Sequence, residues 1–136
     1  MRVAIDTNVF ISSLLIQESR PAKLITLWRE GRFKLLTAAP QLDELTRVTR
    51  YPKIRARLNQ ALAGRLINEI REIAIMVDVL PNVNVSPDPY DNYILSICVG
   101  GAADYLITGD KNDLLAFKKF DKTSIVSVSE FLAMRN

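Results

Sequence analysis

The sequence VAIDTNVF at residues 3–10 decides the fold that we expect for this chain. Residues 3–5 are apolar and indicate a short strand that enters a core, and the apolar residues Val9 and Phe10 then continue as a helix would. Asp6 therefore stands at the corner between a strand and a helix. In open parallel sheets, ligands bind at such corners. The carboxylates that join Asp6 there decide whether the chain can hold a metal ion.

Strands and helices alternate along the rest of the sequence. Further strands are expected at residues 33–37, 105–107 and 124–126, whereas residues 76–80 either form another strand or prolong the helix before them. Helical patterns occupy residues 9–15, 19–30, 40–50, 53–58, 60–75, 90–102 and the stretch after 127. The alternation predicts an α/β fold, as one domain over residues 1–136. Its mostly parallel central sheet of four to five strands would be flanked by helices in a three-layer α/β/α arrangement.

Small polar residues and glycines mark where several of these helices begin and end. Ser19 and Asn59 are suited to cap helix N-termini, and Ser127 with Glu130 has the pattern of a capping box. The glycine pair at residues 100–101 is expected to end or distort its helix.

The absence of histidine narrows the chemistry that this sequence can perform. None of the 136 residues is histidine, which removes Ser-His-Asp and Cys-His catalysis and the common nitrogen ligand of zinc. A metal held by this chain would take oxygen ligands, as magnesium, manganese and calcium do. The single cysteine, Cys98, lies in an apolar run and is expected as a buried thiol. The net charge of +3 suits a polyanionic partner but is also ordinary for a soluble protein.

Each acidic residue of interest has an ordinary structural explanation when it is taken alone. Asp6 is suited to be a helix N-cap. Glu44 could be a solvated helix charge that pairs with Arg47, three residues on. Asp91 would favour the positive end of its helix, and Asp110 would serve as a turn residue. Taken singly, these acids are better explained by structure than by function.

Taken together, the same acids indicate a metal site. Asp6 and Asp110 both follow strands, and right-handed crossovers bring the carboxyl ends of parallel strands to one edge of a sheet. Helix N-termini lie at that edge too, which would bring Asp91 and Glu44 to the same crevice. Four carboxylates in one crevice repel and raise one another's pKa unless cations neutralise them.

Four motifs carry a resemblance to a known family. They are VAIDTNVF at 3–10, PQLDELTRV at 40–48, DPYDNYIL at 88–95 and GGAADYLITGD at 100–110, the last followed by KNDLL. In their order and spacing, which cover nearly the whole chain, they resemble the PIN domain, the ribonuclease fold of VapC-type toxins and their relatives. The branch that they resemble most is the group of candidate toxins with a Gly-Gly-Ala-Asp-Tyr element.

The resemblance implies particular site residues. It makes four acids both metal ligands and catalytic residues: Asp6, Glu44, Asp91 and Asp110. Asn8 and Thr108 would be polar neighbours that orient them. Asp88 is either an auxiliary ligand or only a turn residue, because this chain has a less dense acidic run there than related sequences.

The resemblance also implies an activity and partners. It indicates an endoribonuclease that uses Mg²⁺ or Mn²⁺ and leaves a 5′-phosphate and a 3′-hydroxyl. Water would be the nucleophile, since one ion lowers the pKa of its bound water and a second stabilises the leaving oxygen. The family further implies the toxin of a toxin–antitoxin system, a homodimer, and an antitoxin protein as partner. We expect a cytoplasmic protein without a membrane partner, because the sequence has no signal-peptide pattern and no apolar run of ~18 residues.

Basic residues just after Glu44 are candidates for RNA binding. They are Arg47, Arg50, Lys53 and Arg55, with Arg57 beyond them. Tyr51 among them offers a stacking surface for a base. A solvated helix face explains the same residues equally well.

Two other functions fit parts of the sequence. A receiver-like signalling domain is also α/β with acids and magnesium at its strand ends, but it needs an adjacent acidic pair where this chain has Asp6 alone. A catalytically inactive module of the PIN fold that binds RNA or protein would keep the acids as a structural cluster. Manganese binding and RNA cleavage separate these functions from a nuclease.

Overall fold

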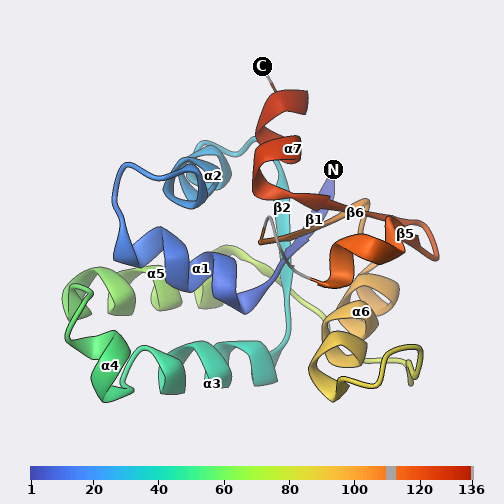
Figure 1. Cartoon of the computed structure of the whole chain (residues 1–136), viewed down its shortest axis with the longest axis horizontal. Coiled ribbons are helices and arrows are strands. Elements are labelled where there is room, and N and C mark those ends of the chain that lie inside the picture. The colour runs from blue at the N-terminus through green and yellow to red at the C-terminus, as the bar shows by residue number, and fades with distance from the viewer. Residues whose placement is uncertain (110–112, 136) are drawn as a thin grey trace.

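The expected first strand is β1 (Arg2–Ile5), which lies inside a sheet rather than at its edge. The computed structural model (Figure 1) describes residues 1–109 and 113–135. In these residues the strand order is β3-β2-β1-β4-β6-β5. The other strands are β2 (Lys34–Thr37), β3 (Ile75–Met76), β4 (Tyr105–Thr108), β5 (Lys119–Phe120) and β6 (Thr123–Ser127). All pairings are parallel except that of β5 with β6. The mostly parallel α/β fold is therefore confirmed.

Two strands differ in detail from the expectation. The strand expected at residues 76–80 is only the pair Ile75–Met76, which continues the sheet beside β2, and the preceding helix ends at Ile73. The described part of the chain also has a sixth strand, β5, where four to five strands were expected. This two-residue edge strand has no apolar run of its own, and it forms because its chain turns back onto β6.

Helices cover both faces of the sheet. They are α1 (Thr7–Leu15), α2 (Arg20–Arg29), α3 (Ala39–Val48), α4 (Pro52–Arg55), α5 (Gln60–Ile73), α6 (Pro89–Gly101) and α7 (Val128–Met134), with a 3-10 helix, η1 (Asp113–Phe117). Val3 and Ile5 of β1 face a core shared with α1, α2, α3, α5 and α7. Ala4, between them, faces a second core shared with α6 and η1. In Figure 1, α6 accordingly lies across the sheet from α1, α3 and α5.

The expected helix starts are confirmed. Ser19 and Asn59 accept hydrogen bonds from the first-turn backbone of α2 and α5, respectively. Ser127 and Glu130 form the capping box that begins α7. Within residues 1–109 and 113–135, every helix is too short or too polar to cross a membrane.

The glycine pair at the end of α6 serves close packing. A Cβ on Gly100 would lie 2.5 Å from the carbonyl oxygen of Val79, and one on Gly101 would lie 2.8 Å from Cδ1 of Leu36. The helix continues through both glycines and is ended by Ala102, which adopts a left-handed conformation with φ of 53°. The glycines are therefore needed because the last turn of α6 packs directly against β2 and the backbone at residue 79.

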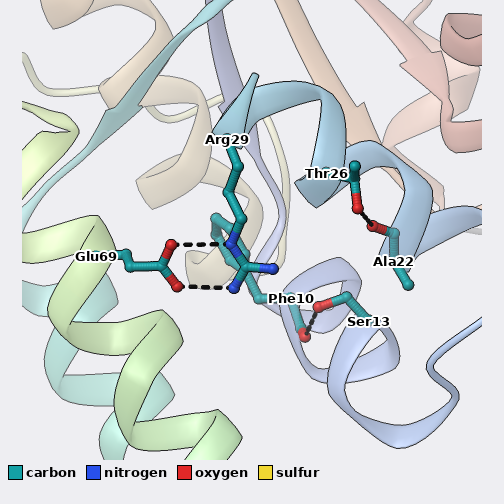
Figure 2. A network of polar contacts seen from close by, with 6 residues as sticks. All are labelled: Phe10, Ser13, Ala22, Thr26, Arg29 and Glu69. Carbon is teal, nitrogen blue, oxygen red and sulfur yellow. Dashed lines mark hydrogen bonds and ion pairs between the residues drawn. The ribbon is translucent and has the colours of Figure 1, made fainter. Parts of the chain in front are cut away.

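Figure 2 shows the ion pair of Arg29 and Glu69 that connects α2 to α5, which we call the α2–α5 joint. Arg29 reaches from α2 to Glu69 on α5, with Nε donating at 2.9 Å and Nη2 at 2.7 Å to the two carboxylate oxygens. The hydroxyls of Thr26 and Ser13 donate to carbonyls of their own helices. The charged groups of this joint are thus matched to each other in bidentate geometry.

Candidate metal centre

Asp6 lies where β1 ends, in the interior of the sheet. Its backbone N–H donates to the Ile107 carbonyl of β4 at 2.9 Å. Its side chain is fully buried and accepts hydrogen bonds from the Asn8 backbone at 3.2 Å, the Tyr90 hydroxyl at 2.6 Å and the Thr108 hydroxyl at 2.8 Å. Asp6 is the N-cap of α1, as the structural explanation requires. The two hydroxyl bonds come from α6 and β4, so the carboxylate also joins three elements at one point.

Tyr90, in the first turn of α6, is a site residue that the sequence analysis did not identify. Its hydroxyl donates to Asp6 and accepts a hydrogen bond from the backbone N–H of Thr7 at 3.1 Å. Burial, followed by the negative charge of Asp6, raises the pKa of Tyr90 well above its usual range. The hydroxyl therefore keeps its proton and stays a donor. Its place beside Asp91, in the first turn of a helix, puts Tyr90 near the ligand-binding edge, but nothing local in the sequence distinguishes it from a surface tyrosine.

The two polar neighbours expected beside Asp6 differ in how they meet it. Thr108 is buried at the end of β4, and its hydroxyl holds Oδ2 of Asp6. Asn8 donates to Asp6 through its backbone N–H, and the residue is exposed on α1. Thr108 thus orients the carboxylate directly, whereas the side chain of Asn8 faces the surface.

Glu44, on α3, carries a buried oxygen without a hydrogen bond. Its Oε1 has no partner among the described residues, although the residue as a whole is only partly buried. The expected surface partner Arg47 donates instead to the Tyr51 hydroxyl at 3.1 Å. A buried carboxylate oxygen without a donor costs free energy, so such atoms usually have a ligand or water beside them.

Gln41 fixes the start of α3 against the corner where Asp6 lies. Its Nε2 donates to the Ile5 carbonyl at 2.7 Å and to the Thr7 hydroxyl at 3.3 Å. Its Oε1 accepts from the Thr37 hydroxyl of β2 at 2.7 Å. Because Gln41 is fully buried and one helical turn before Glu44, this network ties the position of Glu44 to the ends of β1 and β2.

The two acids at the start of α6 have different roles in the structure. Asp88 is exposed and is the N-cap, accepting from the Tyr90 backbone N–H at 2.9 Å. Asp91 accepts from the Ser86 hydroxyl at 3.1 Å. Burial raises the pKa of Asp91, and the negative charges of Asp88 and Asp6 raise it further, against the opposite effect of the Ser86 bond. Asp88 is therefore the cap of α6 in the structure, and the pKa of Asp91 responds to the charges of both Asp88 and Asp6.

Asp110, the fourth expected ligand, lies outside the described residues. Among the residues that are described, no three histidine, cysteine, aspartate or glutamate side chains are grouped closely enough to form a metal site by themselves. The structure therefore supplies three of the four acids as separate oxygen donors around one edge of the sheet.

Comparison with known proteins identifies the family of the fold. The family model of the PIN domain matches residues 2–112. The chain belongs to the PIN domain family. It is also 30% identical over 123 residues to Uncharacterized protein MJ1680 of Methanocaldococcus jannaschii, a match that covers 90% of this chain and 78% of that protein. PIN domains are generally nucleases and typically use divalent metal ions, so this chain has a nuclease-type fold.

The donor set of this PIN domain fits a hard divalent cation by its chemistry. Asp6, Glu44 and Asp91 offer carboxylate oxygens, the ligands that magnesium and manganese prefer. The unpaired oxygen of Glu44 and the raised pKa of Asp91 are both conditions that a nearby cation would relieve. A cation bound by these residues would complete its coordination with water or a substrate phosphate, as magnesium commonly does.

The basic residues of the PIN domain that were considered for RNA binding are exposed. They are Arg47 on α3, Arg50 after it, and Lys53 and Arg55 on α4. Tyr51 is 46% exposed and holds the Arg47 side chain through its hydroxyl. The exposure suits both a nucleic-acid surface and a solvated helix face.

Proposed function

We propose that this PIN domain is an endoribonuclease that hydrolyses RNA phosphodiester bonds with Mg²⁺ or Mn²⁺. Asp6, Glu44, Asp91 and Asp110 would hold the metal. The observation that carries the proposal is the buried Oε1 of Glu44, which has no hydrogen-bond partner among residues 1–109 and 113–135 and lies on a helix that Gln41 bonds to the same corner as Asp6. A buried carboxylate oxygen without a hydrogen bond is better explained by a role in ligand binding than by a contribution to stability.

The residues around the metal would each perform a limited task. Bound there, a divalent cation would activate water and stabilise the charge that develops on the phosphate. Tyr90 and Thr108 keep the Asp6 carboxylate in one orientation through their hydroxyl protons. Burial raises the pKa of Cys98 to about 12, so this thiol is no nucleophile. The sequence has no histidine, which leaves water as the nucleophile that best suits the site.

The biological setting belongs to the same proposal. The motifs that resemble VapC-type toxins support a cytoplasmic toxin of a toxin–antitoxin system, acting as a homodimer with an antitoxin protein as partner. The exposed cations Arg47, Arg50, Lys53 and Arg55 would hold the RNA backbone. Replacing Arg50 and Lys53 together by alanine would then weaken RNA binding and flatten its dependence on salt concentration.

Manganese-dependent cleavage of mixed RNA tests the activity. We expect the wild type to cleave and Asp6→Asn and Asp91→Asn to lose activity by about 100-fold or more, since both carboxylates would be metal ligands. The matched control is Asp43→Asn, which removes an exposed acid of α3 beside Glu44 and should cleave like the wild type. A wild-type protein that binds RNA without cutting it would be the inactive module, and the nuclease proposal would fail.

A further inference from the structure

A hollow adjoins the candidate metal centre. It has a volume of about 340 Å³ and lies between α1, α2, the start of α7 and the residue after β4. Two of its lining residues connect it to the centre: Asn8, whose backbone N–H donates to Asp6, and Gly109, which follows Thr108. A molecule in this hollow would therefore be a neighbour of a phosphate at the centre.

The hollow has apolar walls and a polar rim. Val9, Pro21 and Val128 form the walls, and Val9 and Val128 are 2% and 4% exposed, so the walls belong to the packed core and are rigid. Ser12 and Arg20 lie on the rim. This combination suits a flat group with apolar faces and polar edges.

Arg20 is held in place at the rim. Its Nη1 donates to the Ser129 hydroxyl at 2.8 Å, which links the start of α2 to α7. A guanidinium has five N–H donors in one plane, so this single bond leaves others for a ligand. Arginine stacks on bases and bonds to their edges, while an exposed guanidinium at an apolar wall also attracts phosphate.

We propose that this hollow binds one nucleobase of the RNA, next to the phosphate that is cut, with Arg20 contacting its edge. The proposal rests on the nuclease function proposed above and adds a determinant of substrate choice to it. The volume is near the lower end of the ~300–1,000 Å³ of ligand pockets, which fits a single base. A base in such a hollow must be unpaired, so the nucleotide beside the cut would lie in a single-stranded segment.

Two variants test the subsite, each with a matched control. Ser12→Leu fills the hollow with an apolar side chain that suits a helix, and Ser13→Leu makes the same change one residue further along α1, outside the hollow. Arg20→Ala removes the rim cation, and Lys23→Ala removes an exposed cation from the same helix outside the hollow. Cleavage is measured on single-stranded RNA with randomised sequence, together with the base that flanks each cut. Binding is measured separately with a short labelled RNA in EDTA.

We expect the wild type and both controls to share one flanking-base preference. Ser12→Leu and Arg20→Ala should lose that preference and raise KM about tenfold with kcat changed much less, as expected for the loss of one bound base. They should also bind the short RNA about tenfold more weakly. Cleavage by the wild type with an unchanged preference in both variants would overturn the subsite and leave the nuclease function standing. If the wild type does not cleave, the nuclease function fails, and unchanged binding in EDTA would overturn the subsite as well.

Discussion

Acidic side chains have opposite environments in two regions of the molecule, the α2–α5 joint and the carboxyl edge of the sheet. At the joint, Glu69 receives two hydrogen bonds from Arg29 (Figure 2), and the pair is complete within the chain. At the sheet edge, Glu44 keeps a buried oxygen without a partner among the described residues, and Asp91 lies in the field of Asp6 and other acids. The first region uses acids to connect helices. The second holds acids whose oxygens and charges are only partly matched by other groups in the described part of the chain.

This difference between paired and incompletely paired acids indicates which of them have a functional rather than a structural role. A surface ion pair contributes only about 0–1 kcal/mol, and it can be lost with little harm. An unpaired buried carboxylate oxygen costs free energy, and the fold tolerates it where it is useful. Substitutions in the two regions should therefore separate stability from activity.

The largest effect is expected from Glu44→Gln compared with Glu69→Gln. Glu44→Gln should lower manganese-dependent RNA cleavage by about 100-fold, because a metal ligand loses its charge, while the free energy of unfolding stays equal or rises. Glu69→Gln should leave cleavage unchanged and lower the free energy of unfolding by about 0.5 kcal/mol. Cleavage rates and urea denaturation check both. Equal losses of activity in the two variants would remove the distinction.

The next effect is expected from the two tyrosines of α6. Tyr90→Phe removes the donor to Asp6 and should weaken manganese binding by about tenfold, since the carboxylate loses its fixed orientation. It should also lower the free energy of unfolding by about 1.5 kcal/mol, as for a hydrogen bond to a charged group. Tyr93→Phe is the matched control, because in the described part of the chain the Tyr93 hydroxyl donates no hydrogen bond to a side chain. Calorimetric titration with manganese and denaturation should show no loss in that control.

A smaller effect concerns the dependence of stability on pH. Burial and neighbouring acids raise the pKa of Asp91 in the folded chain, so the folded state holds this proton more tightly than the unfolded state does. The resulting stabilisation is complete below the usual carboxyl pKa and is lost as the pH rises through the raised folded-state pKa. Melting temperatures measured in EDTA should therefore show a flatter decline over this pH range in Asp91→Asn than in the wild type. Parallel profiles would show that Asp91 does not titrate in this way.

The smallest effect is expected from the helix cap. Asp88→Asn should leave both cleavage and stability close to those of the wild type, because asparagine caps a helix as well as aspartate does. Asp88→Ala should lower the free energy of unfolding by about 1 kcal/mol with cleavage unchanged. A 100-fold loss of cleavage in Asp88→Asn would instead make Asp88 a metal ligand.

The fold was predictable where its signals are local. The caps at Ser19 and Asn59, the capping box that begins at Ser127 and the parallel alternation all follow from residues close together in the sequence. The strand β5 was not predictable, because its two residues become a strand only by pairing with β6. The need for the glycine pair of α6 was not predictable either, because it arises from segments distant in the sequence that pack against the helix.

The acids of the candidate site could be proposed from the sequence, but the residues that hold them in position could not. Asp6, Glu44 and Asp91 could be proposed because strand ends and helix starts meet at one edge of a parallel sheet. Tyr90 and Gln41 were missed, since each acts through contacts with residues far away in the sequence. A tyrosine or glutamine near a helix start has no local pattern that distinguishes a buried donor from a surface residue.

The Thr108 bond to Asp6 has a consequence for folding order. It spans 102 residues, and the strands that carry the two side chains, β4 and β1, are adjacent in the sheet. Contacts between such distant segments form late, after shorter loops have closed. In a growing chain that does not yet include β4, Asp6 would lack the hydrogen bond from Thr108. The orientation of the Asp6 carboxylate is thus completed only once β4 has joined the sheet.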